Sequence, residues 1–360
     1  MPPGKTLRNL KKLVLAAAPL LCSLSLSGPA AAQSTTPPYK TTVFATAPNG
    51  TSQPDSIVQW RNSVIVGFGN GVAKDGTDGK SSTIVEYSLT GLVRRMFTVL
   101  GHNDGLRIRP ETDELWALQN EDGNPNSEPN LVIIDLRTGE RKPYVIPSVN
   151  GGGGYDDVVF KDDQIFITAS NPNPNPNVPP LTHFPALIRL TLAGSSVTTE
   201  PVLYNDASAT DIATGAPVTL NLTDPDSLTI DPRGNLVVDS QADFELVFIR
   251  HPSTDTDDQT LGLLTITTPT NPPTKTTVDD TAFAPSSSRT FLLVSDLTLN
   301  TIYRIDSKPF GFEPGAAYSA SDTSGLVGKL DLDTGVLTPI VTGLKSDRGM
   351  LFVVPREEDE

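Results

Sequence analysis

Short apolar runs separated by polar turns recur along most of the chain. One pattern appears six times: an aspartate, one or two small or apolar residues, an apolar run of strand length, a polar turn and a second apolar run. The copies begin about 50 to 70 residues apart, a spacing that indicates a repeated structural unit. Their first residues are Asp55, Asp104, Asp157, Asp226, Asp280 and Asp347.

A third kind of apolar run lies between these pairs and predicts a further strand in each copy. Several of these runs end in turns such as Thr90-Gly91 and Thr138-Gly139, after which a fourth strand follows. Four short antiparallel strands per repeat form a propeller blade, so we predict an all-β chain folded as a single β-propeller with six blades. Two tandem β-sandwiches would also give many short strands but leave the recurring aspartate unexplained. The third runs are 83–88, 131–136, 186–191, 246–250, 301–306 and 326–332.

The last copy has too few strands of its own. After Asp347 only one strand precedes the end of the sequence, so the last blade must take strands from elsewhere. Segment 39–47 precedes the first copy, and we expect it to supply an outer strand that closes the ring and removes exposed strand edges. In the alternative arrangement, the fifth blade keeps both 301–306 and 326–341, with an insertion between them.

Three segments interrupt the repeats and are predicted to be loops. The chain has 28 glycines and 32 prolines, which break helices and favour turns. Segment 171–180 alternates asparagine and proline, a composition typical of an extended, polyproline-like loop. The other two segments are 205–217 and 310–324.

Residues 1–32 have the pattern of a secretory signal peptide. Four basic residues precede an apolar run over 13–27, and three alanines follow as a cleavage site. The run is shorter than the roughly 20 residues that span a bilayer, so we predict a secreted or periplasmic protein without a transmembrane segment. The predicted organisation is a signal peptide over 1–32, a propeller over 33–354 and an acidic tail over 355–360. The only cysteine, Cys22, lies in the first segment, which excludes disulfides and Cys-ligated metals from the mature chain.

The charge of the chain limits its partners. Its 27 lysines and arginines against 42 aspartates and glutamates give a net charge of −15. This excess of negative charge repels nucleic acid and anionic membranes, and it favours divalent cations as guests. We therefore expect a monomer that takes a small molecule or a glycan in its channel and binds no nucleic acid.

The recurring aspartates suggest a metal site. Each precedes the innermost strand of a blade, and innermost strands line the central channel, so several carboxylates are expected to face one axis. Carboxylates that lie close together raise one another's pKa or require a bound cation. Calcium, which takes about six to eight oxygen ligands, fits such a ring better than zinc does. In the alternative, each aspartate only caps its own turn by accepting hydrogen bonds from backbone N–H groups.

Two short segments resemble a known family. The runs Pro225 to Val238 (PDSLTIDPRGNLVV) and Asn103 to Leu106 (NDGL) are similar to motifs of the regucalcin/gluconolactonase group and of NHL-type six-bladed propellers. The rhythm of the repeats extends this resemblance over about residues 55 to 354. It implies that Asp226 binds a divalent metal and acts near a lactone, and that Asn103 or Asp104 supplies a second ligand.

The sequence also departs from the family pattern. The first metal ligand of the family is a glutamate before a Gly-Pro-Val-Trp run, whereas Asp55 precedes Ser-Ile-Val-Gln-Trp here. Ser227 replaces the usual glycine after Asp226.

The expected function is a secreted, metal-dependent hydrolase of the lactonase type, in which a calcium-like ion polarises the ester carbonyl and activates water. Asp226 and His102 are the candidate catalytic residues, because His102 lies near the channel mouth and can act as a general base near neutral pH. A non-catalytic platform for a protein or a glycan at the cell surface is the main alternative, and a lyase or synthase is another. The predicted metal ligands are Asp55, Asn103, Asp104, Asp157, Asp226 and Asp280.

Overall fold

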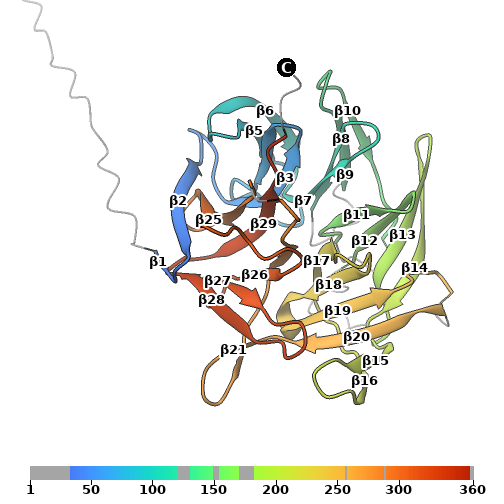
Figure 1. The fold of residues 1–360 in the computed structure, drawn as a ribbon. Helices are drawn as coiled ribbons and strands as arrows, with labels where there is room; N and C mark the ends of the chain where they lie inside the picture. Colours follow the sequence, from blue (N-terminus) through green and yellow to red (C-terminus); the bar gives the residue numbers. More distant parts are fainter. Residues whose placement is uncertain are drawn as a thin grey trace, which may run out of the picture. The chain divides into compact units, whose positions relative to one another are not determined.

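The computed structural model describes residues 33–120, 130–148, 154–169, 182–255, 258–287 and 289–356. In these ranges the chain forms strands and one short 3₁₀ helix, Gln241–Asp243, and contains no α-helix. Six sheets are arranged as the blades of a β-propeller (Figure 1), which confirms the predicted all-β class and the six blades.

The first three blades are each made of four consecutive antiparallel strands. Their second strands are apolar on both faces and almost fully buried, because each lies between two neighbouring blades. From the innermost strand outward, the first blade contains β3 (Pro54–Trp60), β4 (Ser63–Phe68), β5 (Ser81–Ser88) and β6 (Val93–Leu100), the second β7 (Asn103–Arg109), β8 (Glu114–Gln119), β9 (Leu131–Asp135) and β10 (Arg141–Tyr144), and the third β11 (Val158–Lys161), β12 (Gln164–Thr168), β13 (Pro185–Ala193) and β14 (Ser196–Tyr204).

The fourth blade has two additional strands at its outer edge. β15 (Ser208–Asp211) pairs in parallel with the outermost regular strand, and β16 (Pro217–Thr219) pairs with β15. Segment 205–217, predicted to be a loop, therefore contains strand; its short polar sequence carries no alternating apolar signal. The four regular strands are β17 (Pro225–Ile230), β18 (Leu236–Ser240), β19 (Glu245–Arg250) and β20 (Thr260–Thr265).

The fifth and sixth blades exchange strands along the chain. After β23 (Asp280–Phe283), the chain leaves the fifth blade and forms β24 (Phe291–Asp296) and β25 (Thr301–Ser307) of the sixth. It then returns to the fifth blade and ends with β29, the innermost strand of the sixth. The remaining strands of the fifth blade are β26 (Ala317–Ser321), β27 (Leu326–Leu330) and β28 (Leu337–Thr342), and β29 spans Asp347–Val353.

This exchange corrects two predictions. Segment 310–324, predicted to be a loop, contains β26, the second strand of the fifth blade. All five residues of β26 are buried although its sequence is AYSAS: Tyr318 is one of the largest fully buried side chains, and the other four residues are small. The expected second strand of the Asp280 copy and the 301–306 run both belong to the sixth blade, so the fifth blade does not keep 301–306.

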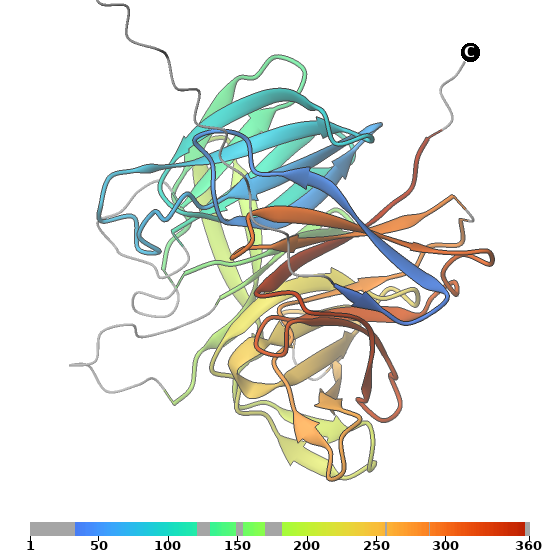
Figure 2. The ribbon, with the colours of Figure 1, turned by 90° about the vertical axis from the view of Figure 1, so that its left-hand side faces the viewer.

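Strand β2 (Tyr39–Thr46) is the outermost strand of the sixth blade and pairs with β25. The predicted outer strand over 39–47 is therefore present, in the same sheet as the last strand of the chain, and Figure 2 shows this blue strand beside the orange strands of that blade. A short strand, β1 (Ser34–Thr35), extends the fifth blade, and a two-stranded ribbon, β21 (Thr267–Thr268) with β22 (Thr274–Lys275), lies outside the six blades.

Six apolar clusters hold the blades together, one between each pair of neighbours. The cluster between the first and second blades, for example, contains Ile65, Leu106 and Leu115. Each fully buried aliphatic side chain contributes about 1.5 to 3 kcal/mol to folding. The core is thus distributed around the ring, and the channel at its centre is left for polar side chains.

Two predictions fall outside the described residues: the signal peptide over 1–32 and the loop over 171–180. Most of the predicted acidic tail, 357–360, also lies outside them. Across the described ranges, no helix has the length and apolar character that crossing a membrane would require.

Candidate functional site

A cavity of about 830 Å³ lies where the six innermost strands meet. All six strands, or the residues just before them, contribute side chains to its wall, so the cavity occupies the channel of the propeller. Its lining includes eight aspartates and only three cationic side chains, Lys74, Arg107 and Arg348. The wall of the channel is therefore strongly acidic.

A β-bulge near the start of the innermost strands determines which side chains face this cavity. In four blades, two consecutive residues of the innermost strand lie opposite a single residue of the second strand. Such a bulge bends the strand and redirects its side chains. The bulged pairs are Asp55-Ser56, Asp104-Gly105, Asp226-Ser227 and Arg348-Gly349.

The other two blades place an Asp-Asp pair at the same point. Asp156-Asp157 precedes Val158, and Asp279-Asp280 precedes Thr281. One contact shows that these pairs are equivalent: Asp157 and Asp280 each accept a hydrogen bond from a backbone N–H of the next blade.

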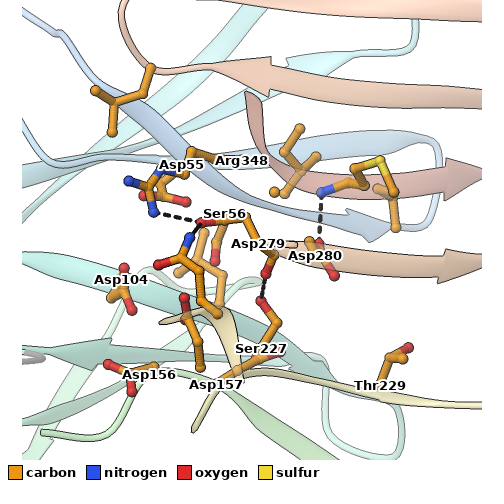
Figure 3. A pocket seen from close by; sticks show the side chains of 18 of the residues that line it. Asp55, Ser56, Asp104, Asp156, Asp157, Ser227, Thr229, Asp279, Asp280 and Arg348 are labelled. Carbon is orange, nitrogen blue, oxygen red and sulfur yellow. Dashed lines mark hydrogen bonds and ion pairs between the residues drawn. The ribbon is translucent and has the colours of Figure 1, made fainter. Parts of the chain in front are cut away.

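The first residues of the six pairs form what we call the channel ring, and all six line the cavity. Asp347, the start of the sixth predicted copy, is not one of them, because it lies one position before the ring residue Arg348. Its side chain is fully buried and accepts a hydrogen bond from the Ser321 N–H at 2.9 Å. Figure 3 shows Asp55, Asp104, Asp156, Asp279 and Arg348 around one space. The channel ring consists of Asp55, Asp104, Asp156, Asp226, Asp279 and Arg348.

The second residues of the pairs form what we call the latch positions, because five of the six contact or closely approach the following blade. Asp157 Oδ2 accepts the Leu228 N–H at 3.0 Å, and Asp280 Oδ2 accepts the Met350 N–H at 2.7 Å. Ser227 Oγ donates to the backbone oxygen of the fifth-blade residue Asp279. The latch positions are Ser56, Gly105, Asp157, Ser227, Asp280 and Gly349.

Two latch positions are glycine because the next blade is too close for any side chain. A Cβ on Gly105 would lie 2.0 Å from the Asp156 backbone oxygen, and one on Gly349 would lie 2.5 Å from the Asp55 backbone oxygen. The sequence requirement at these positions is therefore steric.

Arg107 connects three blades beside the ring. Its Nη2 donates to Asp157 Oδ2 at 2.7 Å and to the Leu228 backbone oxygen at 2.8 Å, and its Nε donates to the Val158 backbone oxygen at 2.6 Å. Burial raises the pKa of Asp157, while the positive charge of Arg107 opposes that rise. Arg107 thus provides the counter-charge for this latch aspartate.

Two ring carboxyls, Asp226 and Asp279, and the latch carboxyls Asp157 and Asp280 have a raised pKa and hold protons more tightly than ordinary carboxyls. Burial, followed by repulsion from Asp279 and Asp156, raises the pKa of Asp226 well above its usual value. Burial raises the pKa of Asp279 to about 8 although Arg348 opposes the rise, and burial raises the pKa of Asp280 to about 7. Part of the acidic wall is therefore protonated near neutral pH.

The predicted site residues fall into three groups. Asp55, Asp104 and Asp226 are in the channel ring, whereas Asp157 and Asp280 are at latch positions that also line the cavity. His102 lies at the cavity wall, where Nδ1 is 3.1 Å from the Val72 backbone oxygen. Asn103 is fully buried and is not part of the wall; its Nδ2 donates to the Leu118 backbone oxygen at 2.9 Å.

The predicted calcium ion stays a prediction. Among the described residues, no three His, Cys, Asp or Glu side chains are grouped so that they could hold a metal ion. The geometry gives a reason: latch carboxylates are directed to backbone N–H groups, and the sixth place in the ring carries a guanidinium.

Sequence reasoning missed several residues of the wall. Asp156, Asp279 and Arg348 occupy ring places, and Arg107 bridges the blades beside them. The doubled aspartates contained a signal for the first two, because Asp156 and Asp279 each lie one position before an aspartate that the repeat identified. No such signal marks Arg348, where the recurring aspartate of the sequence lies one position too early.

No family model and no curated protein matches the chain. Among the solved structures similar to it are a candidate gluconolactonase (12% identity, 86% of this chain and 83% of that chain, TM-score 0.46) and virginiamycin B lyase from Staphylococcus aureus (10%, 85% and 88%, 0.46). A streptogramin B lyase gives similar values (10%, 85% and 87%, 0.46). Similarity at this level transfers no activity or substrate to this chain, and the chain itself defines a six-bladed β-propeller with an acidic channel.

Proposed function

We propose that this propeller binds a small organic cation in its acidic channel. The observation that carries the proposal is the channel ring, in which five of six equivalent places are aspartate and all face one cavity. The cavity volume of about 830 Å³ lies within the range of small-molecule sites. A positively charged ligand would bring its charge to carboxylates that otherwise repel one another.

The electrostatics of the ring support this choice of ligand. Burial, and then repulsion from neighbouring carboxylates, raise the pKa of Asp226. A cation placed among the carboxylates stabilises their ionised forms, so it lowers their pKa values and releases protons as it binds. A neutral molecule of the same shape has no such gain.

An organic cation fits the described residues better than a bare metal ion does. Calcium needs several oxygen ligands at about 2.3 to 2.6 Å, and the described part of the chain groups no such set. The cavity is also much larger than one ion requires. Calcium binding and a secreted or periplasmic location remain predictions from the sequence.

Hydrolase or lyase activity is the second candidate, favoured by the proton affinity of the ring. A carboxyl with a pKa near the working pH can act as a general acid or base, and burial raises the pKa of Asp279 to about 8. Asp226 and Asp279 are the groups that would transfer the proton in such a reaction. Turnover of simple lactones tests this candidate, and loss of that turnover in Asp226→Asn would assign it to the channel.

Titration calorimetry of the full chain with an alkylamine tests the binding proposal, with the alcohol of the same carbon chain as the uncharged control. We expect the amine to bind, the alcohol not to bind, and Asp226→Asn to weaken amine binding by about ten-fold. The matched variant Asp331→Asn, which changes an exposed turn carboxylate, should leave the affinity unchanged. Equal binding of amine and alcohol, or binding of calcium chloride alone, would refute the proposal.

A further inference from the structure

The innermost strands of neighbouring blades start at the same level of the channel. The latch hydrogen bonds that join the third blade to the fourth, the fourth to the fifth and the fifth to the sixth each link positions within one residue of each other in the repeat. Residues that follow the ring by the same number of steps, and that line the same cavity, therefore lie at a similar depth. The wall of the cavity can thus be described level by level.

Beyond the ring, the wall formed by the fourth, fifth and sixth blades is apolar. Four apolar side chains lie three or four residues further along β17, β23 and β29 than the ring members of these strands, and they line the same cavity. They are partly exposed, whereas most apolar side chains of the core are buried. A strand rises about 3.3 Å per residue, so they lie roughly 10 Å from the ring. These residues, which we call the apolar wall, are Ile230, Ala282, Phe283 and Leu351.

The cavity therefore has a charged level and an apolar level. Figure 3 shows Thr229, which directly precedes the apolar-wall residue Ile230, on the side of the pocket away from the ring residues Asp104 and Asp156. A ligand that fills the cavity contacts carboxyl groups with one part and hydrocarbon side chains with another.

The basic side chains of the lining lie at different levels. Arg348 is a ring member, and Lys74 lies in the connection between β4 and β5, at the ring end of the first blade. Arg107 lies three residues beyond its ring member Asp104, and its guanidinium is held there by Asp157 and by two backbone oxygens. A cationic group at the level of Arg107 is repelled, so the positive charge of a ligand is directed to the ring.

On the basis of the proposed function, we infer that the ligand is an amphipathic monocation, with its ammonium group among the ring carboxyls and its hydrocarbon part against the apolar wall. Burial of that hydrocarbon part adds free energy in proportion to the apolar area removed from water. A second cationic group at the far end of the ligand would lie beside the apolar wall and Arg107, which disfavours diamines.

Titration calorimetry of the full chain with butylamine and hexylamine tests this inference. We expect the affinity to rise about ten-fold from butylamine to hexylamine, because two more methylene groups are buried. Leu351→Asn, a polar replacement of similar size, should reduce that rise to about three-fold or less. Leu192→Asn is the matched control: Leu192 lies on β13, packs against the cluster between the second and third blades, and should leave the rise at about ten-fold.

The outcomes separate this inference from the proposed function. Equal affinity for butylamine and hexylamine in wild type would overturn the inference and leave cation binding standing. The same ten-fold rise in Leu351→Asn would also overturn it, and Ile230→Thr provides this comparison if Leu351→Asn does not fold. Absence of amine binding, or binding of hexanol as tight as that of hexylamine, would refute the proposed function and the inference with it.

Asp226→Asn tests the position of the ammonium group. It should weaken the binding of both amines by the same factor, because it changes the charged level and leaves the apolar wall intact. A loss of affinity confined to hexylamine would contradict the assignment of the two levels.

Discussion

The channel ring and the latch positions differ by a single step along each innermost strand, yet they have opposite roles. Ring side chains face the cavity, where they repel one another and can meet a ligand. Latch side chains contact the next blade through hydrogen bonds or, where glycine is required, through close backbone packing. The ring therefore holds charge that is costly to bury, and the latches hold the blades around it.

The adjacent aspartates of the third and fifth blades make the difference clear. Asp156 and Asp279 are ring members, whereas Asp157 and Asp280 accept backbone N–H groups of the following blade. The residue type is identical in each pair, so the position along the chain, and not the residue type, assigns the role. Substitutions at the two sets should separate stability from binding.

The largest expected effect is a dependence of stability on pH that reflects both sets. Burial raises the pKa of Asp279 in the ring to about 8 and that of Asp280 at a latch to about 7. Because the folded chain binds these protons more tightly than the unfolded chain, the free energy of unfolding should fall by several kcal/mol as pH rises from about 4 to about 8.

The pKa of Asp113 is lowered rather than raised, so Asp113 limits the gain in stability at low pH. Arg137, Trp60 and Arg61 lower its pKa to about 2, so its contribution is lost as pH falls below about 4. Denaturant unfolding across the pH range should therefore show maximum stability near about pH 4 to 5. A maximum near neutral pH would contradict the raised pKa values, and Asp279→Asn should reduce the decline on the alkaline side.

A second prediction concerns the steric latches. Gly105→Ala places a Cβ 2.0 Å from the Asp156 backbone oxygen, so the second and third blades must separate locally. We expect a loss of about 3 kcal/mol in the free energy of unfolding. Gly234→Ala is the control, since it has open space but a φ of 84°, and should cost only about 1 kcal/mol. Equal losses in the two variants would show that blade contact is not the cause.

A third prediction concerns the hydrogen-bonded latches. Asp157→Ala removes the acceptor of the Leu228 N–H and the partner of Arg107, which should cost about 2 kcal/mol. The expected loss in the free energy of unfolding is moderate because the Arg107 side chain is 31% exposed, so water can solvate it once Asp157 is removed. Glu200→Ala breaks an exposed ion pair with Arg189 and should cost less than about 0.5 kcal/mol in the same denaturant measurement.

The smallest expected effect on stability belongs to the ring itself. Asp226→Asn replaces a carboxyl whose pKa is raised by burial and by its neighbours with a neutral group of the same shape. The free energy of unfolding, measured by thermal unfolding at neutral pH, should therefore change by less than about 1 kcal/mol. The affinity for an alkylamine, measured by calorimetry, should fall. A large loss of stability with unchanged binding would reverse the roles assigned to ring and latch.

Sequence reasoning identified much of the fold because each blade repeats the same pattern. The innermost and second strands of the first four blades follow directly from the recurring aspartate and the apolar runs after it. It failed at β26, whose sequence AYSAS contains two serines and no Val, Ile or Leu, and this error led to the wrong assignment of β24 and β25. A strand without a run of large aliphatic residues carries little hydrophobic signal.

The site was predicted less completely than the fold. Asp55, Asp104 and Asp226 were found because their bulges contain a single aspartate. In the two Asp-Asp pairs, the repeat pattern identified the second aspartate, so the prediction named the latch residues Asp157 and Asp280. The ring residues are Asp156 and Asp279. The predicted calcium ion and the catalytic role of His102 are still predictions.

The sequence by itself determined that the chain is β-structured, repeats six times and brings many carboxylates to the start of its innermost strands, because these properties depend on local composition and period. Only the tertiary structure decided which carboxylates share the channel and which fasten neighbouring blades. That distinction arises from a bulge whose register depends on pairing with a second strand, and from blades that are far apart in sequence. The positive charge of Arg348 enters the ring for the same reason.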